Sequence, residues 1–303
     1  MSSLKSLFEA QSVAIVGASD DPHKLGGRPV AYMKRLGYQG KLIPINPKSD
    51  VVQGLAAKRS LAELDAPVDL AVIATPEFLV EGIIKEGLAC GIKNFVVFAS
   101  GYAEINAEGQ ARQQRLEALF VETDARLLGP NCLGFINTET QLVASFTTAM
   151  EQHPLKVGGL SFAGHSGALG AYWLDKTIRA DIGVSKWISS GNEVNIQLAD
   201  IVEYLADDPQ TSVICLYIEV DSLSEMIRYS EFYLSGNELS GKRIGVVSIS
   251  GGAGVMLSDQ LENAGLSISA FSDDLCTKMH PLLSVFSANQ NPIDVTAALV
   301  AEP

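Results

Sequence analysis

Residues 12–27 read SVAIVGASDDPHKLGG, which has the form of a buried strand that ends in a phosphate-binding turn. The run from Ser12 to Val16 is apolar, long enough for a parallel strand and too short for a helix. Gly17 ends it, small residues follow, and the pair Gly26-Gly27 stands where a helix can begin. Small residues there let backbone N–H groups approach an anion, and a helix N-terminus adds partial positive charge. We therefore expect a phosphate group of a ligand at this turn.

The turn differs from the usual dinucleotide fingerprint, because Gly17 is followed by Ala18-Ser19 and not by x-Gly-x-x-Gly. An NAD site also requires an acidic residue at the end of the second strand, where it holds the ribose 2′-hydroxyl. Here the second strand, 41–45, ends in Asn46-Pro47-Lys48. A cation there suits a ribose that carries a phosphate, so coenzyme A with its 3′-phosphate, or NADP, fits better than NAD. The alternative is that Lys48 is a solvated turn lysine.

Composition limits the classes of protein. The 303 residues are 47% apolar and 19% charged, which is enough for two or three domains with cores of their own. The net charge of −13 argues against binding to nucleic acid or to anionic membranes. No apolar run reaches the roughly 18 residues of a membrane helix and the start has no signal-peptide pattern, so we expect a cytoplasmic protein. Four separated cysteines without a CxxC pair argue against a zinc site and against a disulfide framework, and no metal site is expected; they are Cys90, Cys132, Cys215 and Cys276.

Strand and helix patterns alternate over residues 1–146, which is typical of an α/β domain with a parallel sheet covered on both faces. Strands are expected at 12–16, 41–45, 69–74, 94–98 and 126–128, and helices at 27–36, 77–87 and 107–122. Ligands on such sheets bind beyond the carboxyl ends of the strands. The turns at that edge are all small, polar or turn-forming: Gly17–Asp20, Asn46–Lys48, Ala74–Pro76, Ala99–Gly101 and Gly129–Cys132. They predict a groove for an extended ligand.

A second α/β domain is expected over 157–235, after a linker at 147–156. A strand at 159–163 leads into the turn Gly164–Gly170, which opens a helix and again has the form of an anion site. Strands at 185–189 and 213–218 and a helix at 196–206 follow. Glu219 ends the last of these strands, at the same edge of the sheet as the Gly164 turn, which makes it a candidate site residue. The alternative is that Glu219 is a residue at this edge without a functional role.

A third unit, 241–303, repeats this pattern with a strand at 243–249, the turn Ser250–Gly254 and a helix at 255–264. The pattern then gives a strand at 266–270 and a helix around 273–280. A domain of this type needs more strands, so we expect this one to be truncated.

Nine motifs in chain order resemble those of the NDP-forming acyl-CoA synthetases, which are related to the succinyl-CoA synthetase alpha subunit: VAIVGAS, INPKS, DLAVIATP, GPNCLGFIN, HSGALG, SSGNE, LYIE, SISGGAGV and NPIDVT. The resemblance covers essentially the whole chain. It implies a coenzyme-A-binding Rossmann domain followed by flavodoxin-like CoA-ligase domains with parallel sheets. It also implies an acid–thiol ligase that interconverts acyl-CoA, phosphate and ADP with acid, CoA and ATP, through an acyl phosphate and a phosphohistidine. ADP or ATP with Mg would bind to an ATP-grasp module, on another domain or subunit.

The resemblance also assigns residues. Coenzyme A would be held by Gly17, Ser19, Lys24, Asn46, Lys48, Thr75, Pro76, Ser100, Asn131 and Cys132, the last two near its thiol. Phosphate would bind at two helix N-termini, through Gly164, Ser166, Gly167, Gly251 and Gly252. Two helix N-termini supply both positioning and charge stabilisation for phosphoryl transfer. The catalytic candidates are Glu219, which would orient the phosphohistidine, and His165.

Three features depart from the family pattern. Gly164-His165-Ser166-Gly167 stands where the family has Ser-Gln-Ser-Gly. Glu219 is followed at once by Val220, without the stretch whose Ser-His-Thr-Gly loop carries the phosphorylated histidine, and the sequence contains no ATP-grasp module. None of the four histidines can therefore take the phosphohistidine role, and the form given is expected to be inactive in that step.

Two functions of different class remain. The first is the core of an NDP-forming acyl-CoA synthetase, expected to be oligomeric and completed by an ATP-grasp domain or subunit. The alternative is a non-catalytic CoA- or acyl-CoA-binding regulatory module, such as that accompanying a protein acetyltransferase. An NADP-dependent oxidoreductase is a weaker third, since no Tyr-Lys pair accompanies the fold.

Overall fold

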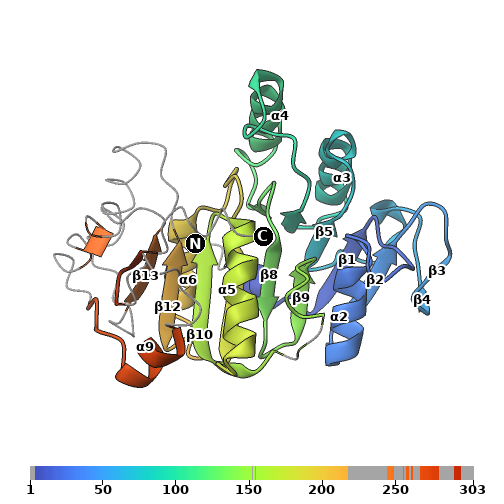
Figure 1. Cartoon of the computed structure of the whole chain (residues 1–303). Helices are drawn as coiled ribbons and strands as arrows, with labels where there is room; N and C mark the ends of the chain where they lie inside the picture. The colour runs from blue at the N-terminus through green and yellow to red at the C-terminus, as the bar shows by residue number, and fades with distance from the viewer. Residues whose placement is uncertain are drawn as a thin grey trace. The chain divides into compact units, whose positions relative to one another are not determined.

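The computed structural model describes residues 4–151, 153, 155–217, 244–248, 255, 257–258, 261, 267–279 and 290–294. The chain divides into two compact units, each built from two stretches of sequence: unit 1 holds 1–148 and 187–200, and unit 2 holds 149–186 and 201–303. Both contain parallel strands and helices (Figure 1), which confirms the α/β class. Among the residues just given, no helix combines the length and the apolar character needed to span a membrane.

Unit 1 is organised around a five-stranded sheet in the order β2-β1-β5-β6-β7. All four neighbouring pairs are parallel. In that order the strands are Lys41–Ile45, Ser12–Val16, Leu70–Ile73, Asn94–Val97 and Arg126–Leu128. The helices are α1 (Lys5–Phe8), α2 (Arg28–Leu36), α3 (Glu77–Ala89) and α4 (Ala107–Ala118), with a 3-10 turn η1 at Leu61–Glu63. All eight strands and helices expected in the first domain are present, to within four residues at each end.

Two short antiparallel hairpins are additions that the sequence analysis lacked. One joins β3 (Val51–Val52) to β4 (Leu55–Ala56), and the other joins β8 (Gly134–Asn137) to β9 (Leu142–Ser145). The first follows β2, which is the edge strand of the sheet. The edge position of β2 also explains Pro44. Proline has no backbone N–H to donate to a neighbouring strand, and it is tolerated in an edge strand.

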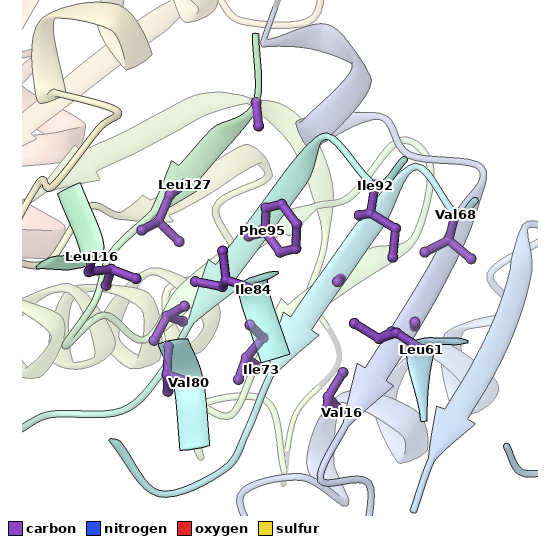
Figure 2. Packing of buried hydrophobic residues seen from close by; sticks show 14 of the residues in the cluster. Val16, Leu61, Val68, Ile73, Val80, Ile84, Ile92, Phe95, Leu116 and Leu127 are labelled. Carbon is purple, nitrogen blue, oxygen red and sulfur yellow. The ribbon is translucent and has the colours of Figure 1, made fainter. Parts of the chain in front are cut away.

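Alternate residues of the parallel strands point to opposite faces of the sheet. Figure 2 shows one face, where Val16, Ile73, Phe95 and Leu127 pack with side chains of the helices. From α3, Val80 and Ile84 join this cluster, and Leu116 joins from α4; all are at most 2% exposed except Val16 at 7%. The neighbouring residues Ile15, Val72 and Val96 are also fully buried, so both faces of the sheet are covered.

Residues 192–196 pack on unit 1 although they follow the second domain's first strands in sequence. The backbone N–H groups of Asn192, Val194 and Ile196 donate to the carbonyls of Pro130 (2.9 Å), Gly129 (3.1 Å) and Leu127 (3.1 Å). Val194 belongs to the hydrophobic cluster of unit 1. This segment therefore continues the bonding edge of β7.

Unit 2 contains the parallel strands β10 (Val157–Gly164), β12 (Val213–Tyr217), β13 (Ile244–Ser248) and β14 (Ile293–Asp294). The order β14-β13-β12-β10 continues to β11 (Val184–Ser189), which begins in unit 2 and ends in unit 1. The helices of unit 2 are α5 (Gly167–Arg179), α9 (Asp273–Met279) and most of α6 (Leu198–Ala206), whose first three residues belong to unit 1. β13 and β14 lie in the same sheet as β12, although the sequence analysis assigned 241–303 to a domain of its own. The domain limits 1–146, 157–235 and 241–303 stay predictions.

The core of unit 2 contains a buried ion pair. Lys186 in β11 donates from Nζ to Oδ2 of Asp208 at 2.6 Å, and the two side chains are 1% and 3% exposed. Thr211 also donates to Oδ2, and the Gln210 N–H donates to Oδ1 at 3.3 Å. Burial raises the pKa of Asp208, but the hydrogen bonds and the charge of Lys186 outweigh it, so the net pKa is lowered.

Candidate functional site

The carboxyl ends of the five strands of unit 1 carry the ten residues expected to hold coenzyme A. Gly17, directly after β1, has φ +82°, a conformation that glycine adopts readily and other residues rarely. A Cβ atom at Gly17 would lie 2.6 Å from the carbonyl oxygen of Ala74 and 3.0 Å from Cγ2 of Thr75. The loops after β1 and β5 therefore meet with no room for a side chain between them.

Thr75 has a hydroxyl oxygen that is buried and without a hydrogen-bond partner. Most buried side-chain polar atoms have a partner, so one that lacks it beside a tight glycine loop indicates a place for a ligand atom. Pro76 follows as the N-cap of α3, and no side chain caps that helix. An uncapped helix N-terminus suits a negatively charged ligand group.

The loop 17–27 is folded closely on itself. The Ser19 N–H donates to the carbonyl of Gly26 at 3.4 Å, and a Cβ atom at Gly26 would lie 2.1 Å from the carbonyl oxygen of Gly17. The Ser19 hydroxyl accepts from the Asp21 N–H at 3.2 Å, which leaves its proton to donate to a ligand. Lys24 is exposed on this loop. These contacts hold the start and the end of the loop close together.

The loop after β2 is tied to the loop after β1. Asn46 donates from Nδ2 to the carbonyl of Ala18 at 2.8 Å, and its Oδ1 accepts from the Lys48 N–H at 2.8 Å. The Lys48 side chain is exposed. Asn46 therefore positions the backbone from which Lys48 extends, as the expected contact with a ribose phosphate requires.

The loops after β6 and β7 complete the edge. Ser100 is exposed, and the Asn131 N–H donates to the carbonyl of Ala99 at 2.8 Å. Asn131 has φ +55° and donates from Nδ2 to Oδ1 of Asn192 at 3.2 Å. Cys132 is 3% exposed, and burial raises its pKa to about 12. Cys132 is thus a neutral core thiol, although it lies next to the edge.

Sequence reasoning missed two side chains at this edge. Asn192 donates to Oε2 of Glu104 at 2.6 Å and to Oε1 of Gln113 at 3.0 Å, which fixes its amide beside Asn131. Gln53, at the tip of the β3–β4 hairpin, donates from Nε2 to the carbonyls of Ser19 and Gly27, each at 2.9 Å. A signal for Gln53 was present in Val51–Ala56, where Gln-Gly separates two apolar pairs as in a two-residue hairpin.

In unit 2, the expected phosphate turn lies between β10 and α5. Ser166 is the N-cap of α5, and its Oγ accepts from the Leu169 N–H at 3.3 Å. A Cβ atom at Gly164 would lie 2.8 Å from the carbonyl oxygen of Tyr217, and the His165 N–H donates to that oxygen at 3.3 Å. Gly167 begins the helix, and His165 is half-buried beside its first turn. Glu219, Gly251 and Gly252 lie outside the described residues, so their assignments stay predictions.

The two units define an α/β protein with a Rossmann domain, whose strand-end loops carry the residues expected to hold coenzyme A, followed by a flavodoxin-like domain in which a Ser166-capped turn joins β10 to α5. Family models agree with both parts: a CoA binding domain matches residues 11–138, and a succinyl-CoA ligase like flavodoxin domain matches residues 157–231. The chain belongs to the NDP-forming acyl-CoA synthetases, relatives of the succinyl-CoA synthetase alpha subunit.

Individual relatives are similar along nearly the whole chain. It is 29% identical to the alpha subunit of acetate–CoA ligase (ADP-forming) II of Pyrococcus furiosus, covering 97% of this chain and 76% of that one. It is 27% identical to acetate–CoA ligase (ADP-forming) of Methanocaldococcus jannaschii, covering 96% of this chain but only 49% of the relative. The acetyl-coenzyme A synthetase 1 of Ca. Korarchaeum cryptofilum, solved with phosphate and ADP, matches with a TM-score of 0.70 and 26% identity, over 98% of this chain and 76% of that one.

The first of these alignments also concerns the missing segment. It is 357 residues long, whereas this chain has 303, so at least 54 positions of the relative have no counterpart here. The absence of a stretch carrying the phosphohistidine after Glu219 stays a prediction.

Proposed function

We propose that this chain is the CoA-binding and phosphate-binding core of an ADP-forming acyl-CoA synthetase. The main observation in support is the edge of unit 1, where a left-handed Gly17 and the unpartnered Thr75 hydroxyl lie together in a domain that matches a CoA-binding family. The chain spans about half the length of the Methanocaldococcus relative, so an ATP-grasp domain or subunit would supply the nucleotide site for ADP or ATP with Mg.

Coenzyme A fits the groups present. The loop 17–27 and the uncapped start of α3 offer N–H groups to its diphosphate, and Thr75 offers a hydroxyl with no other partner. Lys48 would pair with the 3′-phosphate. Asn131, fixed by Asn192, would lie near the thiol end, and the pKa of about 12 makes Cys132 a poor nucleophile there.

In unit 2, the first turn of α5 would bind phosphate or the phosphoryl group of an acyl phosphate. Ser166 caps that turn, and His165 stands beside it, where the imidazole would contact the phosphate. Glu219 would orient the phosphohistidine of a complete enzyme. We assign His165 no nucleophilic role, since it lies in the turn that would bind the phosphate and not in a Ser-His-Thr-Gly loop of the kind that carries the family's phosphohistidine.

The test is calorimetric titration of the chain with coenzyme A and, separately, with NADP. We expect saturable binding of coenzyme A and none of NADP at the same concentrations. Tighter binding of NADP would refute the proposal. Turnover of this chain alone does not separate an enzyme core from a non-catalytic binding module, because the stretch that carries the phosphohistidine is absent. A variant with that stretch of a relative inserted after Glu219 is therefore combined with an ATP-grasp subunit, acetate, CoA and ATP. ADP formation is expected of an enzyme core, and CoA binding without ADP formation is expected of a binding module.

A further inference from the structure

The β3–β4 hairpin brings an unusual residue to the CoA-binding loop of unit 1. Its two turn residues, Gln53 and Gly54, have φ +48° and +80°. Both central residues of a two-residue hairpin turn of this kind need positive φ, which favours asparagine, aspartate and glycine. Glutamine is not among the residues favoured in such a turn, so the contacts of its side chain are the feature that could account for a glutamine at this position.

The side chain of Gln53 connects the two ends of the loop. Its Nε2 donates to the carbonyl of Ser19, near the start of the loop, and to the carbonyl of Gly27, at its end, both at 2.9 Å. A primary amide has two N–H donors, and both are used. No other residue type at position 53 has two amide N–H groups at this reach.

The hairpin tip is itself fixed on the loop. The Gln53 N–H donates to Oδ1 of Asp20 at 2.6 Å, and Lys34 of α2 donates from Nζ to the Gln53 carbonyl. Val52 anchors the hairpin with a fully buried side chain. The amide of Gln53 thus has a defined position relative to the loop.

We propose that Gln53 is a positioning residue that holds the loop 17–27 in its ligand-binding shape, and that this sets the affinity for coenzyme A. The second half rests on the proposed function. A loop ordered before binding loses less conformational entropy when the ligand arrives, so affinity falls when the order is removed. Gln53 itself need not touch the ligand.

Gln53→Asn separates this role from a role in the turn. Asparagine is the better residue for left-handed φ, so the hairpin should be at least as stable. Its shorter amide cannot reach both carbonyls. We expect coenzyme A to bind about tenfold more weakly, which corresponds to about 1.4 kcal/mol. The preference of asparagine for the turn should offset part of the stability lost with the two hydrogen bonds, so the urea midpoint should fall little. Gln53→Glu, which has the same length but no N–H donors, should weaken binding at least as much.

Gln39→Glu is the matched control, since Gln39 is exposed and its Nε2 donates to the carbonyl of Gly37, two residues away, at 2.6 Å. It introduces the same charge and should leave the affinity as it is. Hydrogen exchange of the ligand-free protein reports on the loop directly: amides of residues 18–27 should exchange faster in both Gln53 variants and not in the control.

The outcomes are distinct. Unchanged exchange and unchanged CoA affinity in Gln53→Asn would overturn the proposal. Faster exchange with unchanged affinity would also overturn it, because the loop order would then not set binding. A wild-type chain that binds no coenzyme A would refute the proposed function, and the exchange measurement would still decide whether Gln53 holds the loop.

Discussion

Replacing Lys186 by methionine tests the buried ion pair of unit 2. The substitution removes the ammonium group and leaves the carboxylate of Asp208, 3% exposed, without its cation. Removing one partner of a buried pair costs about 3–5 kcal/mol. Thr211 and Gln210 still donate to the carboxylate, so we expect the lower end, about 3 kcal/mol, in the free energy of unfolding.

Urea unfolding followed by tryptophan fluorescence is a suitable assay, because the two tryptophans are Trp173 in α5 and Trp187 next to Lys186. With a slope of about 1–3 kcal/mol per molar urea, the midpoint should fall by roughly 1–3 M. The control is Lys156→Met, which removes an exposed pair with Asp181 of similar length, 2.7 Å, and should cost less than about 1 kcal/mol.

The effect should depend on pH in a known direction. The pKa of Asp208 is lowered in the native protein, so its contribution to stability is present above the unfolded value of about 3.9 and is lost as the pH falls through the lower native pKa. In Lys186→Met the carboxyl can instead be buried neutral at low pH. The gap between wild type and variant should therefore narrow below about pH 5. A Lys186→Met protein no less stable than Lys156→Met at pH 7 would refute this reasoning.

Three further predictions concern the sites. Lys48→Ala should weaken coenzyme A binding by on the order of 1.5–3 kcal/mol, toward the lower value because the side chain is exposed. The wild type should bind dephospho-coenzyme A less tightly than coenzyme A by a similar amount. Equal calorimetric affinities of the wild type for coenzyme A and dephospho-coenzyme A would show that Lys48 is not part of the site. This chain should form no stable phosphohistidine with acetyl-CoA and labelled phosphate. A nucleophile must come within about 3–3.5 Å of the atom that it attacks, and the segment that carries the family's histidine nucleophile is absent from this sequence. An acid-labile, base-stable label on His165 would contradict this prediction. Cys132 and Cys215, whose pKa values burial raises to about 12, should react with a thiol reagent at pH 8 only after unfolding, later than the half-buried Cys90 and Cys276; early labelling of Cys132, located by mass spectrometry, would show that it is accessible.

The sequence predicted the parallel sheet of unit 1 closely, because its strands are continuous apolar runs that are buried on both faces. The strands 12–16, 41–45 and 126–128 have the predicted bounds. The β3–β4 hairpin was missed because two-residue strands have no period to detect, and its turn uses Gln-Gly in place of a common turn pair.

The candidate site could be predicted only as far as strand order allows. Loops at the carboxyl ends of parallel strands share an edge, and this placed Gly17, Thr75 and Asn131 in one region. Contacts between residues distant in sequence, such as Asn192 with Asn131 and Gln53 with Ser19, depend on the packing of the folded chain. No local pattern contains them.

The return of residues 192–196 to unit 1 has a consequence for how such proteins can be rearranged. A fragment ending at Thr148 would leave the carbonyls of Leu127, Gly129 and Pro130 without these N–H donors, and would expose the cluster that Val194 covers. Recombination that transfers the N-terminal 148 residues alone would give a domain in which these three carbonyls, next to the CoA-binding loops, lack their hydrogen-bond donors. A protein that carries residues 1–148 without residues 192–196 is therefore expected to be less stable than one that carries both stretches.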